Sequence, residues 1–78
     1  MKVEVIVRLK EGVLDPQGKA IHHALDSLGY KEVQSVSTGK IITLEVKGDN
    51  PETIQKQVNA MCETLLANLV IEDYQIKI

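Results

Sequence analysis

Two short sequence pairs, each an Asp or Asn followed by proline, constrain the fold of this chain most strongly. They are Asp15-Pro16 and Asn50-Pro51. The side-chain oxygen of Asp or Asn can accept a hydrogen bond from a free N–H group in the first turn of a helix. Proline suits the first helical position because no N–H is needed there. We therefore predict a helix after each pair, within two similar halves, residues 2–37 and 40–78.

Four segments are predicted to be β-strands: residues 3–9, 33–36, 42–47 and 70–78. In the first of them apolar residues occupy the odd-numbered positions, which gives the strand one buried face. The residues between the second and third strands, Ser37-Thr38-Gly39-Lys40, are predicted to form a tight turn with Gly39 in a positive-φ conformation. These two strands would then form a hairpin.

Apolar residues at helical spacing follow each of the two pairs that contain proline. The stripe of the first predicted helix consists of Ile21, Ala24, Leu25 and Leu28, and Gly29 is expected to end this helix in a left-handed conformation. The stripe of the second predicted helix consists of Ile54, Val58, Met61, Leu65 and Leu66. We expect Asn68 to stop the second helix, also in a left-handed conformation.

The predicted order of elements is β-α-β-β-α-β, in a single domain that spans residues 1–78. This order is typical of the ferredoxin-like α+β fold, a two-layer sandwich with two helices on one face of a four-stranded antiparallel sheet. The other face of the sheet has no cover within the chain, and Ile6, Ile41 and Ile71 are expected to point to it. An uncovered apolar face is a natural place for a second chain to bind.

The small size of the chain favours an oligomer. A core built from 78 residues barely offsets the entropy lost when the chain is ordered. The single cysteine, Cys62, rules out an intramolecular disulfide. His22 and His23 are not spaced with Cys62 as zinc ligands would be. We therefore expect a partner chain to supply the missing stability.

Charge and composition argue against several classes of function. The net charge is −2 and the only aromatic residues are Tyr30 and Tyr74, whereas nucleic-acid-binding proteins carry basic patches and stacking aromatic residues. No apolar run approaches the roughly 20 residues that a membrane span requires, and the N-terminal residues do not resemble a signal peptide. We expect a cytoplasmic protein that binds neither nucleic acid nor a membrane.

No group of residues is predicted to form a catalytic, cofactor-binding or metal-binding site. The segment Thr38-Gly39-Lys40 resembles the end of a phosphate-binding loop, but the other glycine and the final Ser or Thr of that motif are missing. His22 and His23 point about 100° apart on a helix, and the sequence places no relay partner beside them. Cys62 is interpreted as a small buried hydrophobic residue, because the neighbouring Glu63 would disfavour a thiolate.

Several blocks of the sequence resemble the PurS family. The most specific block is LKEGVLDPQG, residues 9–18, which contains the first Asp-Pro pair. The remaining blocks are residues 20–30, the Val33 and Val36 pair, Gly39-Lys40, CETLLAN at 62–68 and VIEDY at 70–74. Together they cover nearly the full chain.

The resemblance implies the small, non-catalytic subunit of phosphoribosylformylglycinamidine synthase, which makes an amidine in purine biosynthesis. Such a subunit is expected to form a homodimer or a dimer of dimers. It would bridge the glutaminase subunit PurQ and the synthetase subunit PurL and help ammonia pass between them. The complex would use ATP, Mg and glutamine, and this chain would bind no cofactor. The partner interface is expected at Leu14, Asp15, Pro16, Gln17, Gly18, Gly39, Lys40 and Asn68.

Two positions depart from the pattern of the family. Ser37 stands where a basic residue is expected, which would weaken a polar contact to a partner or ligand. Leu69 stands where proline is expected, which would loosen the turn before the last strand. Neither change is expected to break the fold.

An ACT-like regulatory domain is the main alternative interpretation. Such domains share the predicted order of elements, dimerise, and bind an amino acid at the dimer interface, so free amino acids would raise the melting temperature. An RNA-recognition domain of the same topology would need aromatic residues on its strands. A metal-transfer domain would need a Cys-x-x-Cys pair, which this sequence lacks.

Overall fold

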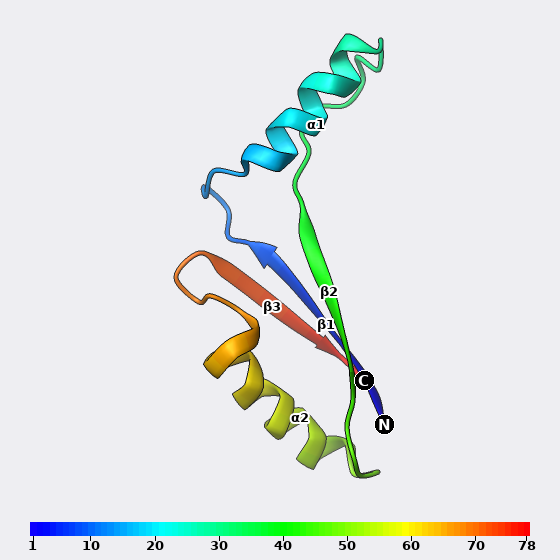
Figure 1. Ribbon diagram of the computed structural model, residues 1–78, viewed down its shortest axis with the longest axis vertical. Coiled ribbons are helices and arrows are strands. Elements are labelled where there is room, and N and C mark those ends of the chain that lie inside the picture. The colour runs from blue at the N-terminus through cyan, green and yellow to red at the C-terminus, as the bar shows by residue number, and fades with distance from the viewer.

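The molecule is elongated, with a sheet at one end and a projecting helix at the other (Figure 1). The computed structural model describes residues 1–78. It measures 49 × 23 × 14 Å and has a Cα radius of gyration of 16.0 Å, whereas a compact chain of this length would have a radius of about 11.5 Å. Part of the chain therefore lies away from the core. We call residues 13–38 the arm and the remaining residues the sheet body.

The sheet body is built on a three-stranded antiparallel sheet in the order β2-β1-β3. Its strands are β1 (Lys2–Leu9), β2 (Gly39–Glu45) and β3 (Glu72–Lys77). The alternation in β1 predicted one buried face, and this is confirmed because Val3, Val5 and Val7 are all 0% exposed. The central strand therefore supplies the middle of the core.

Helix α2 (Pro51–Met61) covers one face of this sheet. Asn50 caps it as predicted, since its side-chain oxygen accepts hydrogen bonds from two N–H groups of the first turn. Ile54 and Val58 are buried with the valines of β1 in one apolar cluster. The second Asx-Pro signal thus places an amphipathic helix over the centre of the sheet.

Helix α2 leaves the residues of both edge strands on the same sheet face only half-buried. The Tyr74 hydroxyl donates a hydrogen bond to Asn59 Oδ1 at 2.6 Å, which ties α2 to β3. On β2, Ile42 and Leu44 are cross-strand partners of the buried valines and lie on the same face. They are half-buried, like Tyr74 and Ile76 of β3. One helix therefore does not complete the layer.

The prediction of a four-stranded sheet is wrong, because residues 33–36 form no strand. No backbone hydrogen bond joins these residues to another part of the chain. The predicted turn is also wrong: Gly39 and Lys40 begin β2, and Gly39 does not have a positive φ. The chain runs straight from residues 33–36 into β2 instead of folding back on it (Figure 1).

Helix α1 (Pro16–Ser27) forms most of the arm and projects away from the sheet (Figure 1). Its predicted ends are confirmed, with Asp15 as the N-terminal cap and Gly29 at a φ of +99° just beyond the C-terminal cap. The prediction that both helices cover one sheet face is wrong. Without the hairpin, the connections on either side of α1 carry it off the sheet, and Leu28 at its C-terminal cap is 74% exposed.

A short π-helical turn, η1 (Cys62–Leu66), follows α2 and changes which residues face the core. Cys62 is 0% exposed, which confirms its interpretation as a buried hydrophobic residue, but Leu65 is 81% exposed although it belongs to the predicted stripe. A π turn adds a residue to the helical repeat, so side chains after it lose their α-helical register. The prediction for Asn68 is wrong as well, because no residue other than glycine has a positive φ.

The sheet face opposite α2 is uncovered within the chain. Ile6 and Ile41 are cross-strand partners on this face, as predicted, and Ile41 is 62% exposed. Ile71, also predicted on this face, precedes β3. Register pairs of opposite charge lie on both sides of the isoleucines, Arg8 with Asp73 and Glu4 with Lys77.

Candidate functional site

The junction between the arm and the sheet body is held by one carboxylate. Asp15 caps α1 by accepting a hydrogen bond from the Gly18 N–H at 2.9 Å. It also accepts from the Thr38 N–H at 2.7 Å and from the Thr38 hydroxyl at 2.9 and 3.1 Å. Because Thr38 directly precedes β2, this carboxylate joins the two segments that connect the arm to the sheet body.

The pKa of the Asp15 carboxyl is lowered from its usual value, mainly by the N–H of Gly18 and then by the N–H of Thr38. Both donors stabilise the charged form, and partial burial opposes them only in part. The carboxylate is therefore ionised at neutral pH. Its contribution to stability is present above the unfolded pKa of about 3.9 and is lost as the pH falls through the lower folded pKa.

Gly18 is buried at the same junction for a packing reason. A Cβ atom at this position would lie 2.5 Å from the carbonyl oxygen of Val36 and 2.9 Å from Asp15 Oδ2. One turn further along α1, His22 Nε2 is 2.9 Å from the carbonyl oxygen of Val33. One side of α1 thus packs closely against the segment that returns to β2.

Most of the predicted interface residues meet at this junction. Asp15, Pro16, Gln17, Gly39 and Lys40 line one hollow of about 500 Å³, together with Val7, Leu9, Thr38 and Glu72. Leu14 lines a neighbouring hollow, and Gly18 is buried beneath the helix start. Asn68 lies outside these hollows, but its N–H donates to the Glu72 carboxylate at 2.7 Å.

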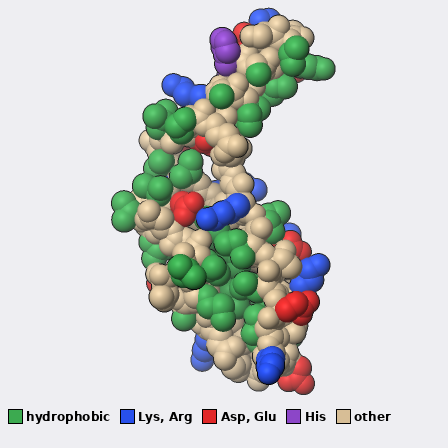
Figure 2. Space-filling model, in the orientation of Figure 1, with side chains coloured by type: hydrophobic (Ala, Val, Ile, Leu, Met, Phe, Trp, Pro, Cys, Tyr) green, Lys and Arg blue, Asp and Glu red, His purple; other side chains and the backbone are tan.

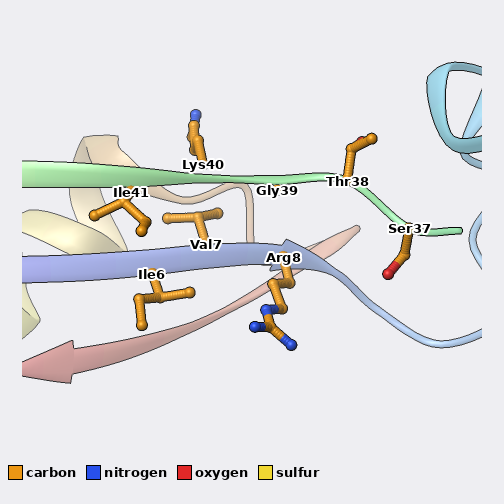
Figure 3. A pocket seen from close by; sticks show the side chains of 8 residues that line it. All are labelled: Ile6, Val7, Arg8, Ser37, Thr38, Gly39, Lys40 and Ile41. Atoms are coloured by element: carbon orange, nitrogen blue, oxygen red, sulfur yellow. The ribbon is translucent and has the colours of Figure 1, made fainter. Parts of the chain in front are cut away.

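A second hollow, of about 560 Å³, lies where β1 and β2 approach the arm (Figure 3). Arg8 and Lys40 both line it, but they point to opposite sides of the sheet (Figure 3), so they do not converge on one anion. Ser37 points to the same side as Arg8. The basic residue expected at position 37 would have added a second cation on that side.

Comparison with known proteins decides the family. A family model described as PurS, phosphoribosylformylglycinamidine (FGAM) synthase, matches residues 2–78. The phosphoribosylformylglycinamidine synthase subunit PurS of Methanocaldococcus jannaschii is 47% identical over 99% of this chain and 93% of its own length. The chain belongs to the PurS family.

Solved structures of PurS proteins share the fold of this chain. The Bacillus subtilis PurS structure is 51% identical and superposes with a TM-score of 0.86 over 97% of this chain and 94% of its own. A chain of the PurLQS structure from Thermotoga maritima is 34% identical, with a TM-score of 0.88 over 97% and 93% of the two chains. This PurS-family chain is thus an accessory subunit of FGAM synthase, a ligase of purine biosynthesis, and works with the other subunits of that enzyme.

The residues of this PurS-family chain that were considered for chemistry lie in the core or in a strand. Burial raises the pKa of the Cys62 thiol, and Glu63 raises it further. Thr38-Gly39-Lys40 enters a strand and no helix follows it, unlike a phosphate-binding loop. No group of three or more His, Cys, Asp and Glu residues could hold a metal ion. Both helices are too short and too polar to cross a membrane.

Two residues of the junction were missed by reasoning from the sequence, Thr38 and Glu72. Thr38 was assigned to a turn, although its N–H and hydroxyl both bind the Asp15 carboxylate. Glu72 was assigned to the last strand, although it lines the hollow that holds Asp15 and Lys40. Strand pairing, which no local pattern reveals, brings Glu72 beside Leu9 at the end of β1 that leads into the junction.

Proposed function

We propose that this chain is the non-catalytic adaptor of FGAM synthase and bridges the glutaminase subunit PurQ and the synthetase subunit PurL. The observation that carries the proposal is the close likeness of the whole chain to the PurS chain of a PurLQS structure, with a TM-score of 0.88. A homodimer or a dimer of dimers in the cytoplasm is part of this proposal.

The proposed bridge helps ammonia move from PurQ to PurL. Ammonia released into water near neutral pH becomes protonated and loses its nucleophilic lone pair, so a path that excludes water speeds the reaction without a catalytic side chain. ATP, Mg and glutamine are assigned to the other subunits. The thiol of Cys62 is buried in the core of this chain, where it packs as a small hydrophobic residue.

The junction is the surface that we assign to partner binding. The predicted interface residues are Leu14, Asp15, Pro16, Gln17, Gly18, Gly39, Lys40 and Asn68, of which Gly18 is buried and Asn68 lies outside the hollows of the junction. Lys40 is exposed on it and shares its hollow with Pro16 and Gln17. The ammonium group of Lys40 suits an acidic surface on PurL or PurQ.

Reconstitution tests the proposal. PurL and PurQ are assayed for glutamine-dependent FGAM formation with and without this chain, and PurL alone is assayed with ammonia. Strong dependence of the glutamine reaction on the chain, with the ammonia reaction little affected, supports the adaptor role. No dependence, together with no co-elution of the three proteins, would reject it.

The same assay tests the junction as the binding surface. Lys40→Glu places like charges against an acidic partner and is expected to raise the half-saturating concentration of the chain about tenfold. Lys56→Glu changes an exposed lysine on α2 away from the junction and serves as the matched control. Equal effects of the two substitutions would show that the partner does not bind at the junction.

A further inference from the structure

The neighbouring hollow that Leu14 lines has a volume of about 600 Å³ and lies between the arm and the sheet body. We call it the arm hollow. Its walls are the end of β1, the loop that leads into α1, the start of α1 and the segment before β2. Figure 2 shows the molecule hollowed where the arm meets the sheet body, with Lys and Arg side chains on either side. The volume is in the range of about 300 to 1,000 Å³ that small-molecule sites have.

Positive charge is concentrated in the arm hollow. Arg8, Lys10 and Lys19 line it, and they are three of the nine Lys and Arg residues of the chain. None of the three forms an ion pair, since the one ion pair of the chain joins Lys31 to Asp26. Cations that share one hollow repel one another unless an anion lies among them. The arm hollow therefore suits a negatively charged group.

Two carboxylates also line the arm hollow, Glu11 and Asp15. The Asp15 oxygens accept hydrogen bonds from Gly18 and Thr38, whereas Glu11 is exposed and is the carboxylate that a ligand can reach. Three cations against two carboxylates leave a surplus of one positive charge, in a chain whose net charge is −2. The arm hollow is thus an electropositive place on an acidic molecule.

The side chains on the sheet side of the arm hollow point the same way. Arg8 and Ser37 lie on one side of the sheet (Figure 3). Lys10 continues β1, because its N–H donates to the Ile71 carbonyl at 2.8 Å, and alternation along the strand places its side chain on the side of Arg8. Ser35 lines the same hollow from the segment before β2. Two cations and a hydroxyl group therefore share one side of the sheet.

Lys19 supplies the third cation from the arm. It follows Gly18 and precedes His22 by one turn, and these two residues of α1 contact the return segment, residues 33–38. Lys19 thus stands at the rim of that contact, where it lines the arm hollow opposite the strand that carries Arg8. Cations from a strand and from a helix therefore surround one space.

The backbone around the arm hollow is held in place. The Val13 N–H donates to the Lys10 carbonyl at 3.1 Å, and Gly12 between them has a φ of +86°, as the third residue of a type II turn requires. Asp15 joins the start of α1 to Thr38. A ligand therefore finds these walls already formed, which lowers the entropy lost on binding.

We propose that the arm hollow binds the phosphate group of a sugar phosphate or ribonucleotide. The phosphate lies among Arg8, Lys10 and Lys19 and accepts hydrogen bonds from the hydroxyl groups of Ser35 and Ser37. A phosphate monoester carries a charge of about −1.5 to −2 near neutral pH and offers three strong acceptor oxygens. Three cations and two hydroxyl donors suit three oxygens better than the two oxygens of a carboxylate.

The sugar is assigned because the arm hollow is larger than a phosphate and contains an acceptor. The exposed Glu11 carboxylate accepts a hydrogen bond from a sugar hydroxyl, whereas it would repel a bare anion. This inference goes beyond the proposed function, since it gives the chain a small-molecule ligand of its own. ATP remains assigned to the other subunits.

Titration of the full chain, labelled with ¹⁵N, by NMR tests the ligand class. Ribose 5-phosphate is expected to shift amide signals of residues 8–15, 19 and 35–38. Inorganic phosphate is expected to bind about threefold more weakly, because it lacks the hydrogen bond to Glu11. Ribose, which has no phosphate, and succinate, a dianion without phosphorus, are expected to bind at least about tenfold more weakly. Succinate that binds as tightly as ribose 5-phosphate, or no shifts with any probe, would overturn the proposal.

Matched substitutions in the same titration test the place. Lys19→Ala and Lys56→Ala each remove an exposed lysine from a helix, but only Lys19 lines the arm hollow. Lys19→Ala is expected to raise the Kd for ribose 5-phosphate about tenfold and Lys56→Ala to leave it unchanged. Circular dichroism checks that both variants fold.

Ser37→Arg tests the place by a gain of affinity, which loss of folding cannot imitate. Ser37 points to the side of Arg8 (Figure 3), so the new guanidinium group adds a cation beside the phosphate and is expected to lower the Kd about tenfold. Equal Kd values for Lys19→Ala and Lys56→Ala, or an unchanged Kd for Ser37→Arg, would reject the arm hollow as the site. These measurements need neither PurL nor PurQ, so they are independent of the reconstitution.

Discussion

At the scale of single residues, the junction depends on side chains whose size and charge leave little freedom. Asp15 accepts hydrogen bonds from both connections of the arm. Gly18 lies so close to Val36 that a methyl group would meet the carbonyl oxygen at 2.5 Å. The Asp-Pro-x-Gly block therefore has a physical explanation. It starts α1 and fixes the direction in which the arm leaves the sheet body.

Gly18→Ala is expected to lower the free energy of unfolding by about 1 to 3 kcal/mol, the usual effect of overpacking. Glycine to alanine inside a helix ordinarily raises stability by roughly 0.5 to 1 kcal/mol, so the sign of the change is informative. Urea unfolding at a fixed protein concentration measures it. The exposed neighbour gives the control, Lys19→Ala, with an expected change within about 0.5 kcal/mol. A stabilised Gly18→Ala protein would contradict the close packing.

At the scale of elements, the sequence predicts those features that local chemistry determines. Both capped helix starts and the buried face of β1 follow from nearby residues, and the structure confirms them. The prediction of a hairpin was wrong because a turn at residues 37–40 needs cross-strand contacts, which local patterns do not reveal. The prediction that Leu65 belongs to the apolar stripe of the second helix was wrong, because η1 breaks the α-helical register. The candidate interface residues were grouped by resemblance, but only the fold shows that five of the eight meet at one hollow.

The attachment of α2 to β3 depends on one polar contact, the hydrogen bond from the Tyr74 hydroxyl to Asn59. Tyr74→Phe is expected to lower the free energy of unfolding by about 1 kcal/mol, the typical net value of a hydrogen bond. Tyr30→Phe is the control, because Tyr30 is 53% exposed. Denaturant unfolding of both variants measures the difference, and equal stabilities would show that the contact does not hold α2.

At the scale of the whole molecule, core and surface are divided unequally between the two parts. Only 8 of the 78 residues are buried, and all but Gly18 lie in the sheet body. The arm therefore relies on its junction, on the return segment and on whatever lies against its apolar stripe. Such a shape suits a subunit whose role is to hold other chains together.

Small-angle X-ray scattering of the chain, diluted until the forward scattering corresponds to one copy of 8.6 kDa, tests whether the arm stays open without a partner. Because the bonds of Asp15 hold the junction, we expect a radius of gyration near 16.0 Å and not near the value of about 11.5 Å for a compact chain. Closure onto its own sheet would give the smaller value and would show that the junction is a free hinge.

The Asp15 contact also sets the angle at which α1 leaves the sheet body. Helix α1 extends roughly 18 Å beyond this contact. A rotation of about 10° there displaces the far end of the helix by about 3 Å, which is roughly half the 5.4 Å pitch of an α-helix. Substitutions at Thr38 or Gly18 can therefore change what the far end of α1 contacts, although neither residue lies at that end.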